Sequence, residues 1–242
     1  VSPRDYGEVI EVDPATMKVT RTIQLALDTA QDKEDSGRGV PNYISSITIS
    51  PDGKRAWVPS KKDNTVRGLA RDGQPLNFES TVRTIVCVID LETNTEVMEM
   101  RHDFNDRDMA FVVRFSKRGD YAFVTTQGTN TVEILDAYTN RPINAIMEVG
   151  RSPQGLAFDD SNALLYIQNF MSRTISVYDL SSTLESTAQT ARPIAEISTV
   201  EKEKLAAQVL QGKQIFYNAN DNRMNHDGYI SCASCHLDGD SD

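Results

Sequence analysis

The residues best suited to chemistry lie close together near the C-terminal end of the sequence. Cys232 and Cys235 are three positions apart, and His236 follows directly, in the run Cys-Ala-Ser-Cys-His. Two thiols one helical turn apart can form thioether bonds to the two vinyl groups of one haem, and the adjacent imidazole can then bind the iron. The motif therefore predicts a covalently attached haem c, bound by Cys232, Cys235 and His236, with His236 as the metal ligand.

Other uses of the same residues stay open at this point. A redox-active Cys-x-x-Cys pair favours a thioredoxin-like βαβ setting, which the sequence does not show. A zinc site needs four ligands, and the motif supplies at most three, with His226 as a further candidate. A disulfide between Cys232 and Cys235 is the third alternative.

A helix and a loop are expected to position this motif. Residues 201–217 have helical spacing of apolar side chains, and Ser198 or Thr199 could cap the start of the helix. Residues 218–228 are polar and rich in turn formers, so they are expected to form a loop. Within that loop, Met224 and His226 are candidates for the second axial ligand of the iron, or else they belong to a solvated segment.

Repeats dominate the first two hundred residues. Residues 47–58, 113–124 and 156–167 align without gaps, and each segment reads as a strand, a tight polar turn and a second strand. A third strand that ends in aspartate follows, and a similar strand opens the chain. These four aspartates are interpreted as caps of turns and not as catalytic groups: Asp13, Asp90, Asp136 and Asp179.

The uninterrupted repeat is about 43 residues, the distance from Asp136 to Asp179. A period of this size with four short strands is typical of a β-propeller blade, and an irregular β-sandwich is the alternative. The fold class is therefore expected to be mainly β. Residues 1–200 would form about three to four blades of a partial ring, with an insert over residues 67–84. Residues 201–242 would begin a helical cytochrome c domain.

Because propellers close into rings, the chain is expected to be part of a longer polypeptide or to be completed by other segments.

Two families carry similar motifs. The repeats resemble those of YVTN-type β-propellers through Ser50-Pro-Asp-Gly53, Ala56-Trp-Val-Pro-Ser60 and Asn64-Thr-Val66, and this resemblance covers about residues 5–200. The last 40 residues resemble the start of the haem domains in the di-haem cytochrome c peroxidase family. That second resemblance extends only to Cys232, Cys235 and His236, since the other haem and metal sites of that family would lie beyond Asp242. The combination resembles fusions of a propeller with a cytochrome.

The remaining candidates have simpler interpretations. His102 is expected to be a surface residue in a connection between blades, and Cys87 a small buried apolar side chain within a strand. The alternating carboxylates of Asp238, Asp240 and Asp242 could bind calcium, or they are solvated acids.

Composition excludes some classes of function. The 242 residues include 35 acidic and 25 basic side chains, a net charge of −10, which argues against a nucleic-acid partner. The longest apolar run, residues 109–113, is far shorter than the roughly 20 residues of a membrane span. The Cys-x-x-Cys-His motif and the resemblance to cytochrome domains imply a c-type haem redox protein, for electron transfer or a peroxidase-like enzyme reaction. Covalent haem attachment and the same resemblance imply a location in the periplasm or outside the cell. Its partners would be a redox protein and the polypeptide that completes the propeller. The alternative is a haem-free extracytoplasmic propeller that acts as a binding or scaffold module.

Overall fold

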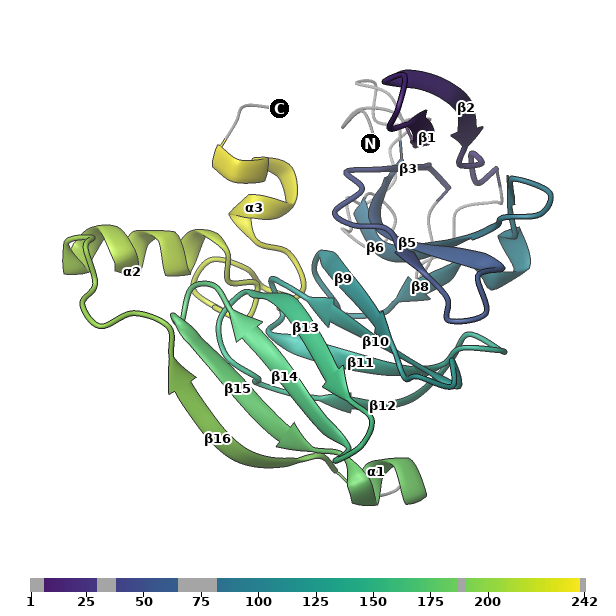
Figure 1. Cartoon of the computed structure of the whole chain (residues 1–242). Helices are drawn as coiled ribbons and strands as arrows, with labels where there is room; N and C mark the ends of the chain where they lie inside the picture. Colours follow the sequence, from purple (N-terminus) through teal and green to yellow (C-terminus); the bar gives the residue numbers. More distant parts are fainter. Residues whose placement is uncertain (1–6, 30–37, 65–81, 187–189, 240–242) are drawn as a thin grey trace. The chain divides into compact units, whose positions relative to one another are not determined.

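The structure is a computed structural model that describes residues 7–29, 38–64, 82–186 and 190–239 (Figure 1). The chain is mainly β, as predicted, and divides into two compact units, Val1–Asn105 and Asp106–Asp242. The change of pattern near residue 200 lies inside the second unit. The division into a propeller domain over residues 1–200 and a cytochrome domain over residues 201–242 stays a prediction.

The second unit contains two four-stranded antiparallel sheets, in each of which consecutive strands are neighbours. The first strands of the two sheets, β9 and β13, lie next to each other. This is the strand order and the packing of neighbouring propeller blades. It confirms the hairpins and third strands that the repeats predict in this unit. The strands are β9 (Ala110–Phe115), β10 (Tyr121–Thr126), β11 (Thr131–Asp136), β12 (Arg141–Ile146), β13 (Pro153–Asp159), β14 (Leu164–Asn169), β15 (Thr174–Asp179) and β16 (Arg192–Ser198).

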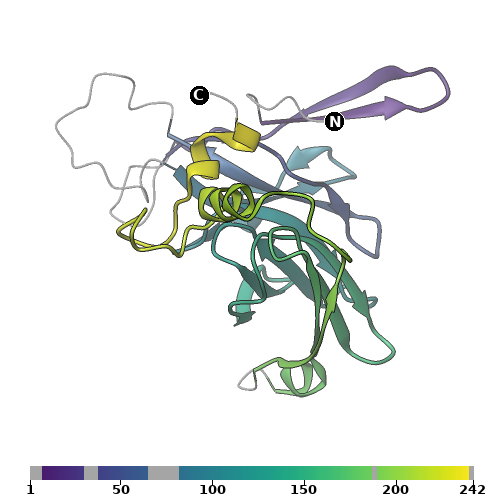
Figure 2. The same cartoon turned by 90° about the vertical axis from the view of Figure 1, so that its left-hand side faces the viewer.

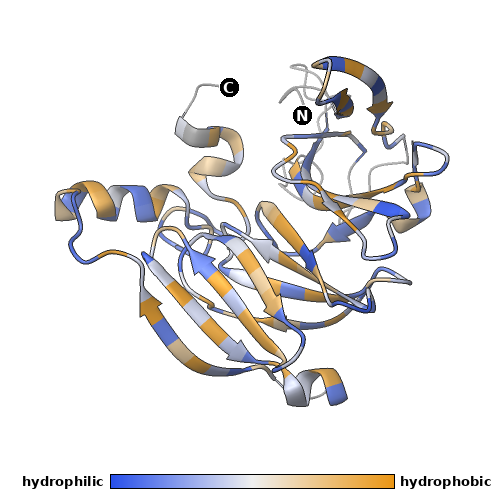
Figure 3. Ribbon diagram, viewed as in Figure 1, coloured by the Kyte–Doolittle hydropathy of each residue, from blue (hydrophilic) through white to orange (hydrophobic). Residues whose placement is uncertain are grey.

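An apolar core joins these two sheets. Phe123, at the aromatic position of the repeat, is fully buried, and its ring lies 4.8 Å from the ring of Phe158 on the next sheet. Ile134, Leu165 and Ile167 belong to the same buried cluster. Along β14 the residues alternate between buried and half-buried, because successive side chains of a strand point to opposite faces. Both apolar and polar residues occur along β14 and β15 (Figure 3).

The first unit contains a six-stranded antiparallel sheet and a two-stranded hairpin, β1–β2, that is not part of that sheet. The long central strands β5 (Arg55–Asp63) and β6 (Val82–Asp90) pair along their whole length, and a common core includes Cys87, confirming it as a small buried side chain. Burial raises the pKa of the Cys87 thiol well above its usual value. The hairpin is visible as a two-stranded ribbon in Figure 2. The other strands are β1 (Glu8–Asp13), β2 (Lys18–Gln24), β3 (Val40–Asn42), β4 (Thr48–Ile49), β7 (Thr95–Glu96) and β8 (His102–Phe104).

Two predictions about this unit need correction. The insert expected over residues 67–84 cannot extend to residue 84, because β6 begins at Val82; residues 65–81 lie outside the described part of the chain. His102 is half-buried within β8 and not in a connection between blades. Its ring packs edge-on against Phe104, with the ring centroids 4.6 Å apart.

The four repeated aspartates cap turns, as predicted. Each ends its strand and accepts a backbone N–H from the residue two positions ahead, at 2.9 Å: Ala15 on Asp13, Glu92 on Asp90, Tyr138 on Asp136 and Ser181 on Asp179. Hydrogen bonds from the turns lower the pKa of all four carboxyl groups. For Asp179, the hydroxyl and the N–H of Ser181 lower the pKa to about 2.

These carboxylates predict acid sensitivity. Because their pKa in the folded chain lies below the ordinary value of about 3.9, they stabilise the fold above that pH, and this stabilisation is lost as pH falls through the folded pKa. We expect the free energy of unfolding in urea to decrease between about pH 5 and pH 2. The difference between wild type and Asp179→Asn should narrow over the same range, whereas Glu185→Gln in the neighbouring helix should leave the profile unchanged. A difference for Asp179→Asn that is constant with pH would contradict this role.

One repeated turn contains a residue in an unfavourable backbone conformation. In the turns that begin at Asp13, Asp90 and Asp136, the residue four positions after the aspartate lies in the left-handed region. Its φ is 54° at Met17, 58° at Asn94 and 56° at Asn140. The amide of that residue bonds the carbonyl of the aspartate at 2.8 Å in all three. Asparagine adopts this conformation at a lower steric cost than methionine does.

We therefore expect Met17→Asn to stabilise the chain by about 1 kcal/mol, measured by urea unfolding. Met17 is 77% exposed, so little packing is lost in the exchange. Met17→Ala is the matched control, because alanine also disfavours positive φ. An equal gain from both substitutions would show that the left-handed turn is not the cause.

No helix within the described ranges is long and apolar enough to cross a membrane.

Candidate functional site

The helix before the Cys motif is shorter than predicted. Helix α2 spans Ala207–Phe216 and begins after Ala206, which makes no side-chain cap. Ser198 ends β16, and the Thr199 amide bonds the carbonyl of Arg173, so the expected helix start at residue 201 and the suggested caps are wrong. Residues 192–199 form the outer strand of a sheet and its extension, and Glu203 makes an ion pair at 3.0 Å with Arg173, which directly precedes β15 of the same sheet, so the chain stays tied to the sheet as far as Glu203 before α2 begins.

Helix α2 rests on the sheets through few contacts. The Gln214 side-chain amide donates to the carbonyl of Met171, in the turn between β14 and β15, at 2.9 Å. No residue of α2 is fully buried, and Val209 is 52% exposed. The apolar stripe expected from the sequence is therefore only partly covered within the part of the chain that the structure describes.

The Cys motif forms a single helical turn, α3 (Cys232–Cys235). Ser231 and Ser234 start this turn as a reciprocal capping box, in which the Ser231 amide donates to the Ser234 hydroxyl at 2.9 Å. The His236 amide closes the turn by donating to the carbonyl of Cys232 at 2.9 Å. The turn thus brings both thiols and the imidazole onto one short segment, as the spacing predicts.

These side chains line a partly open cavity of about 280 Å³. Cys232 and Cys235 are half-buried and form no disulfide, and His236 is exposed. The rest of the lining is largely apolar and comes from α2, the loop after it and the start of α3: Ile215, Asn218, Met224, Ile230 and Ser231.

A buried hydrogen bond fixes the motif to the sheets. Ser234, between the two cysteines, is fully buried and donates to Oδ1 of Asp108 at 2.7 Å. Asp108 is 126 positions earlier and lies just before β9. The backbone of Gly128 packs closely against the Asp108 side chain. A Cβ added at Gly128 would lie 2.0 Å from Oδ2 of Asp108, so no larger residue fits there without displacing that carboxylate.

The loop before the motif docks on the same place. Three hydrogen bonds join it to the turn between β10 and β11: the Ala219 amide donates to the Gly128 carbonyl at 2.8 Å, the Asn220 side-chain amide donates to the Thr129 carbonyl at 2.8 Å, and the Asn130 side-chain amide of the turn donates to Asn218 Oδ1 at 3.0 Å. In Figures 1 and 2 this segment and α3 therefore lie at one end of the sheets of the second unit. Sequence reasoning missed Asp108, Gly128 and Ser234, since nothing local links a loop before a strand to a motif so far along the chain.

The two candidate axial ligands lie in different settings. Met224 lines the cavity and is 58% exposed. The His226 side chain is 98% exposed, and its Nδ1 lies 2.8 Å from a carboxylate oxygen of Asp227. That hydrogen bond raises the pKa of His226. His226 thus occupies the solvated loop, and Met224 is the one of the pair that faces the motif.

The two thiols on one turn, the adjacent imidazole and the apolar side chains beside them are the set of groups that thioether attachment of a haem requires. A disulfide is not formed, and the described residues contain no group of three His, Cys, Asp or Glu side chains that could hold a metal such as zinc. Thioether attachment needs only two accessible thiols on one turn and a nearby imidazole, with apolar surface beside them. The Asp238 side chain and residues 240–242 lie outside the described part, so the calcium suggestion for Asp238, Asp240 and Asp242 stays untested.

No protein-family model matches the chain, and no curated protein matches it. Among solved structures, it is similar to hydrazine synthase of Kuenenia stuttgartiensis, with 13% identity, a TM-score of 0.46, and coverage of 74% of this chain and 67% of that one. The WD40 repeats of RRP9 give 12% identity, a TM-score of 0.45, and coverage of 72% and 43%. The β-propeller domain of Cps50 (Swd1) from Myceliophteria thermophila gives 14% identity, a TM-score of 0.40, and coverage of 78% and 65%. The chain thus spans less than half of the second structure and about two thirds of the other two.

Proposed function

We propose that the chain is a c-type haem redox protein, with haem c joined to Cys232 and Cys235 and with His236 as an axial ligand of the iron. The observation that carries this proposal is the single turn α3, which presents two thiols that are not joined in a disulfide, and the imidazole, beside a largely apolar cavity. When bound, the haem would supply one-electron iron chemistry.

The surrounding residues have separate tasks in this proposal. The Ser234–Asp108 hydrogen bond holds the backbone of α3 in place, so that both thiols keep their spacing. Ile215 and Ile230 would exclude water from the thiol side of the cavity. The half-exposed apolar side of α2 would be covered further when the cavity is filled.

The second axial position separates two versions of the function. If a protein side chain binds there, the chain is an electron carrier; if the position is open, peroxide could bind and the chain would be a peroxidase-type oxidoreductase. Met224 is the candidate that lines the cavity. Cyanide binding to the ferric protein, compared between wild type and Met224→Ala, distinguishes the versions. Cyanide should bind more tightly to the variant only if Met224 is a ligand.

The sheets would serve as a rigid platform for a redox partner. Their blade-like order supports a β-propeller, whose ring would be completed by further polypeptide. We place the protein in the periplasm or outside the cell, because covalent haem attachment occurs outside the cytoplasmic membrane. The net charge of −10 favours a partner with a basic docking surface.

The test is a pyridine haemochrome spectrum of protein made in a host that attaches haem c. We expect the absorption bands of a thioether-linked haem, retained after extraction with acidified acetone. A host without the attachment machinery provides the matched control and should give colourless protein. Colourless protein from both hosts would contradict the proposal.

A second candidate is a haem-free binding or scaffold module. It is favoured by one observation, namely that two neighbouring sheets share a continuous apolar core and form a platform without any cofactor. In that case the chain would have the same fold and stability in both hosts, and alanine at either cysteine would leave its partner binding unchanged.

A further inference from the structure

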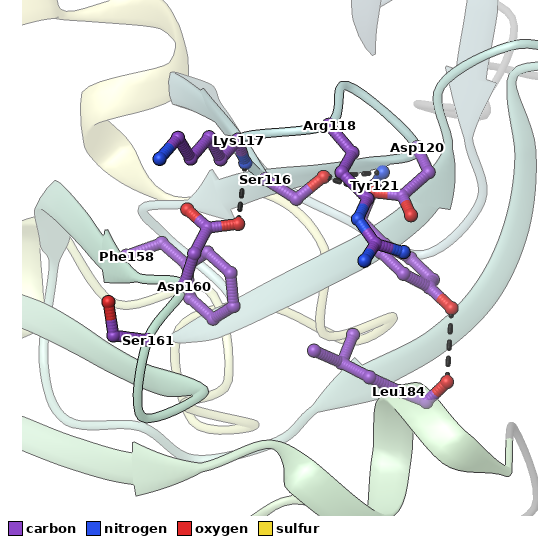
Figure 4. Close-up of a pocket in the computed structure, with 9 residues that line it drawn as sticks. All are labelled: Ser116, Lys117, Arg118, Asp120, Tyr121, Phe158, Asp160, Ser161 and Leu184. Carbon is purple, nitrogen blue, oxygen red and sulfur yellow. Dashed lines mark hydrogen bonds between the residues drawn. The ribbon is translucent and has the colours of Figure 1, made fainter.

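A second cavity, of about 510 Å³, lies between the two sheets of the second unit. Its walls come from the β9–β10 turn, the β13–β14 turn and helix α1 (Ser181–Glu185) (Figure 4). In the second unit these turns and the β10–β11 turn, on which the loop before the Cys motif docks, are at opposite ends of the strands. This cavity is therefore separate from the candidate haem site, and ligand binding in it does not depend on the proposed function.

The inner wall of the cavity is apolar and fixed. It is formed by the half-buried side chains of Tyr121, Phe158 and Leu184. The Tyr121 hydroxyl donates to the carbonyl of Leu184 at 3.1 Å, which links the β10 strand to α1. The Phe158 ring packs on Phe123 in the core. A flat apolar group that enters the cavity would meet two aromatic rings whose positions are set by these contacts.

The rim of the cavity carries two cations and two carboxylates that differ in their partners. Asp160 accepts the backbone N–H of Lys117 at 2.6 Å, and Asp120 accepts the hydroxyl of Ser116. Over residues 7–29, 38–64, 82–186 and 190–239, neither the Lys117 ammonium nor the Arg118 guanidinium has an ion-pair partner. Figure 4 shows Arg118 extending from its turn toward the space between Phe158 and Leu184.

The repeats show that the cation pair is particular to this turn. In the aligned segments, the positions of Lys117 and Arg118 are occupied by Pro51 and Asp52 in the first copy, and by Asp160 and a serine in the third. A turn of this kind forms without cations, so Lys117 and Arg118 are not needed to make the hairpin. Their charge is available for a ligand.

We propose that this pocket binds a small organic anion with a flat apolar body, of the aromatic carboxylate class. The ring lies against Tyr121 and Phe158, and the carboxylate faces Lys117 and Arg118. Guanidinium groups bind carboxylates through two parallel hydrogen bonds, which makes Arg118 the main recognition group. The aspartates of the rim keep the turn in position through their own hydrogen bonds.

The test uses phenylacetate as the probe and the full chain. We expect saturable binding by calorimetry at low ionic strength, with a Kd on the order of 1 mM or tighter. Amide chemical shifts should move at residues 116–121, 158–161 and 184. Acetate, which lacks the ring, and phenylacetamide, which lacks the charge, should each bind roughly tenfold more weakly.

Variants identify the groups responsible. The double variant Lys117→Gln/Arg118→Gln should weaken phenylacetate binding roughly tenfold. The control is Lys202→Gln/Lys204→Gln, which removes the same amount of positive charge from the segment that follows β16, at the end away from α1. This control should leave the Kd unchanged. The proposal is overturned by any of three results: no saturable binding, shifts confined to residues outside the pocket, or equal affinity for phenylacetamide. Equal loss of binding in both double variants would indicate a non-specific charge effect and would also overturn it.

Discussion

Alanine at both Cys232 and Cys235 is expected to abolish covalent haem. Each thioether bond needs one of these sulfurs, and the remaining cysteine of the chain, Cys87, is fully buried in a core of the first unit. Protein made with the attachment machinery should then have the mass of the polypeptide alone. The single variants Cys232→Ala and Cys235→Ala each keep one sulfur, so they should retain at most one thioether bond, with a haemochrome band shifted from that of the wild type.

The matched control for this experiment is Cys87→Ala. This variant also removes one thiol, but from a buried strand, so haem content per folded protein should equal that of the wild type. His236→Ala should keep the thioether bonds and change the spectrum of the iron, because the imidazole would bind the iron and not the porphyrin edge. Haem bound to the double-cysteine variant as firmly as to the wild type would contradict the assignment.

The second large effect is expected from Ser234→Ala. This substitution removes the hydroxyl that donates to Asp108, and it leaves a carboxylate oxygen in a site that is almost closed to solvent. The loss of a buried hydrogen bond to a charged group costs about 2 kcal/mol. We expect this cost to lower the free energy of local opening of α3 by the same amount. In the haem-free chain, Cys232 and Cys235 should then react with a thiol reagent roughly thirtyfold faster in the variant than in the wild type.

Thiol modification followed by mass spectrometry and amide exchange over residues 231–236 measure this effect. Asp108→Asn should act in the same direction as Ser234→Ala. Ser182→Ala is the matched control for Ser234→Ala, since the Ser182 side chain is exposed. Asp221→Asn is the control for Asp108→Asn, since the Asp221 carboxylate bonds Arg223 of its own loop. Unchanged thiol reactivity in Ser234→Ala would mean that the contact with Asp108 does not hold the motif. That outcome would leave the haem proposal itself untouched.

The parts of the fold that could be predicted are those that local sequence specifies. The aspartates that end the repeated strands cap their own turns, so Asp136 and Asp179 could be interpreted without knowledge of any other element. The hairpins around residues 113–124 and 156–167 have alternating apolar residues and polar turns, which are also local signals. The spacing of Cys232, Cys235 and His236 likewise predicts the single turn on which they lie.

The parts that could not be predicted depend on contacts between distant residues. The helical spacing is confirmed for residues 207–216, but the chain before them is tied to the sheet, through Thr199 and through the ion pair of Glu203 with Arg173. His102 belongs to a strand because β8 pairs with β6, which its own neighbours do not reveal. The attachment of α3 to Asp108, and of the loop before it to Gly128, requires the fold itself, since these segments meet only when β9, β10 and β11 are assembled.

The most direct test of the central claim is the intact mass of the wild-type chain under denaturing conditions, after production in the periplasm of a host that attaches haem c. We expect the polypeptide mass plus one haem, with fragmentation assigning the added mass to the segment that contains Cys232 and Cys235. A single species at the mass of the unmodified polypeptide, with both thiols still open to alkylation, would contradict it.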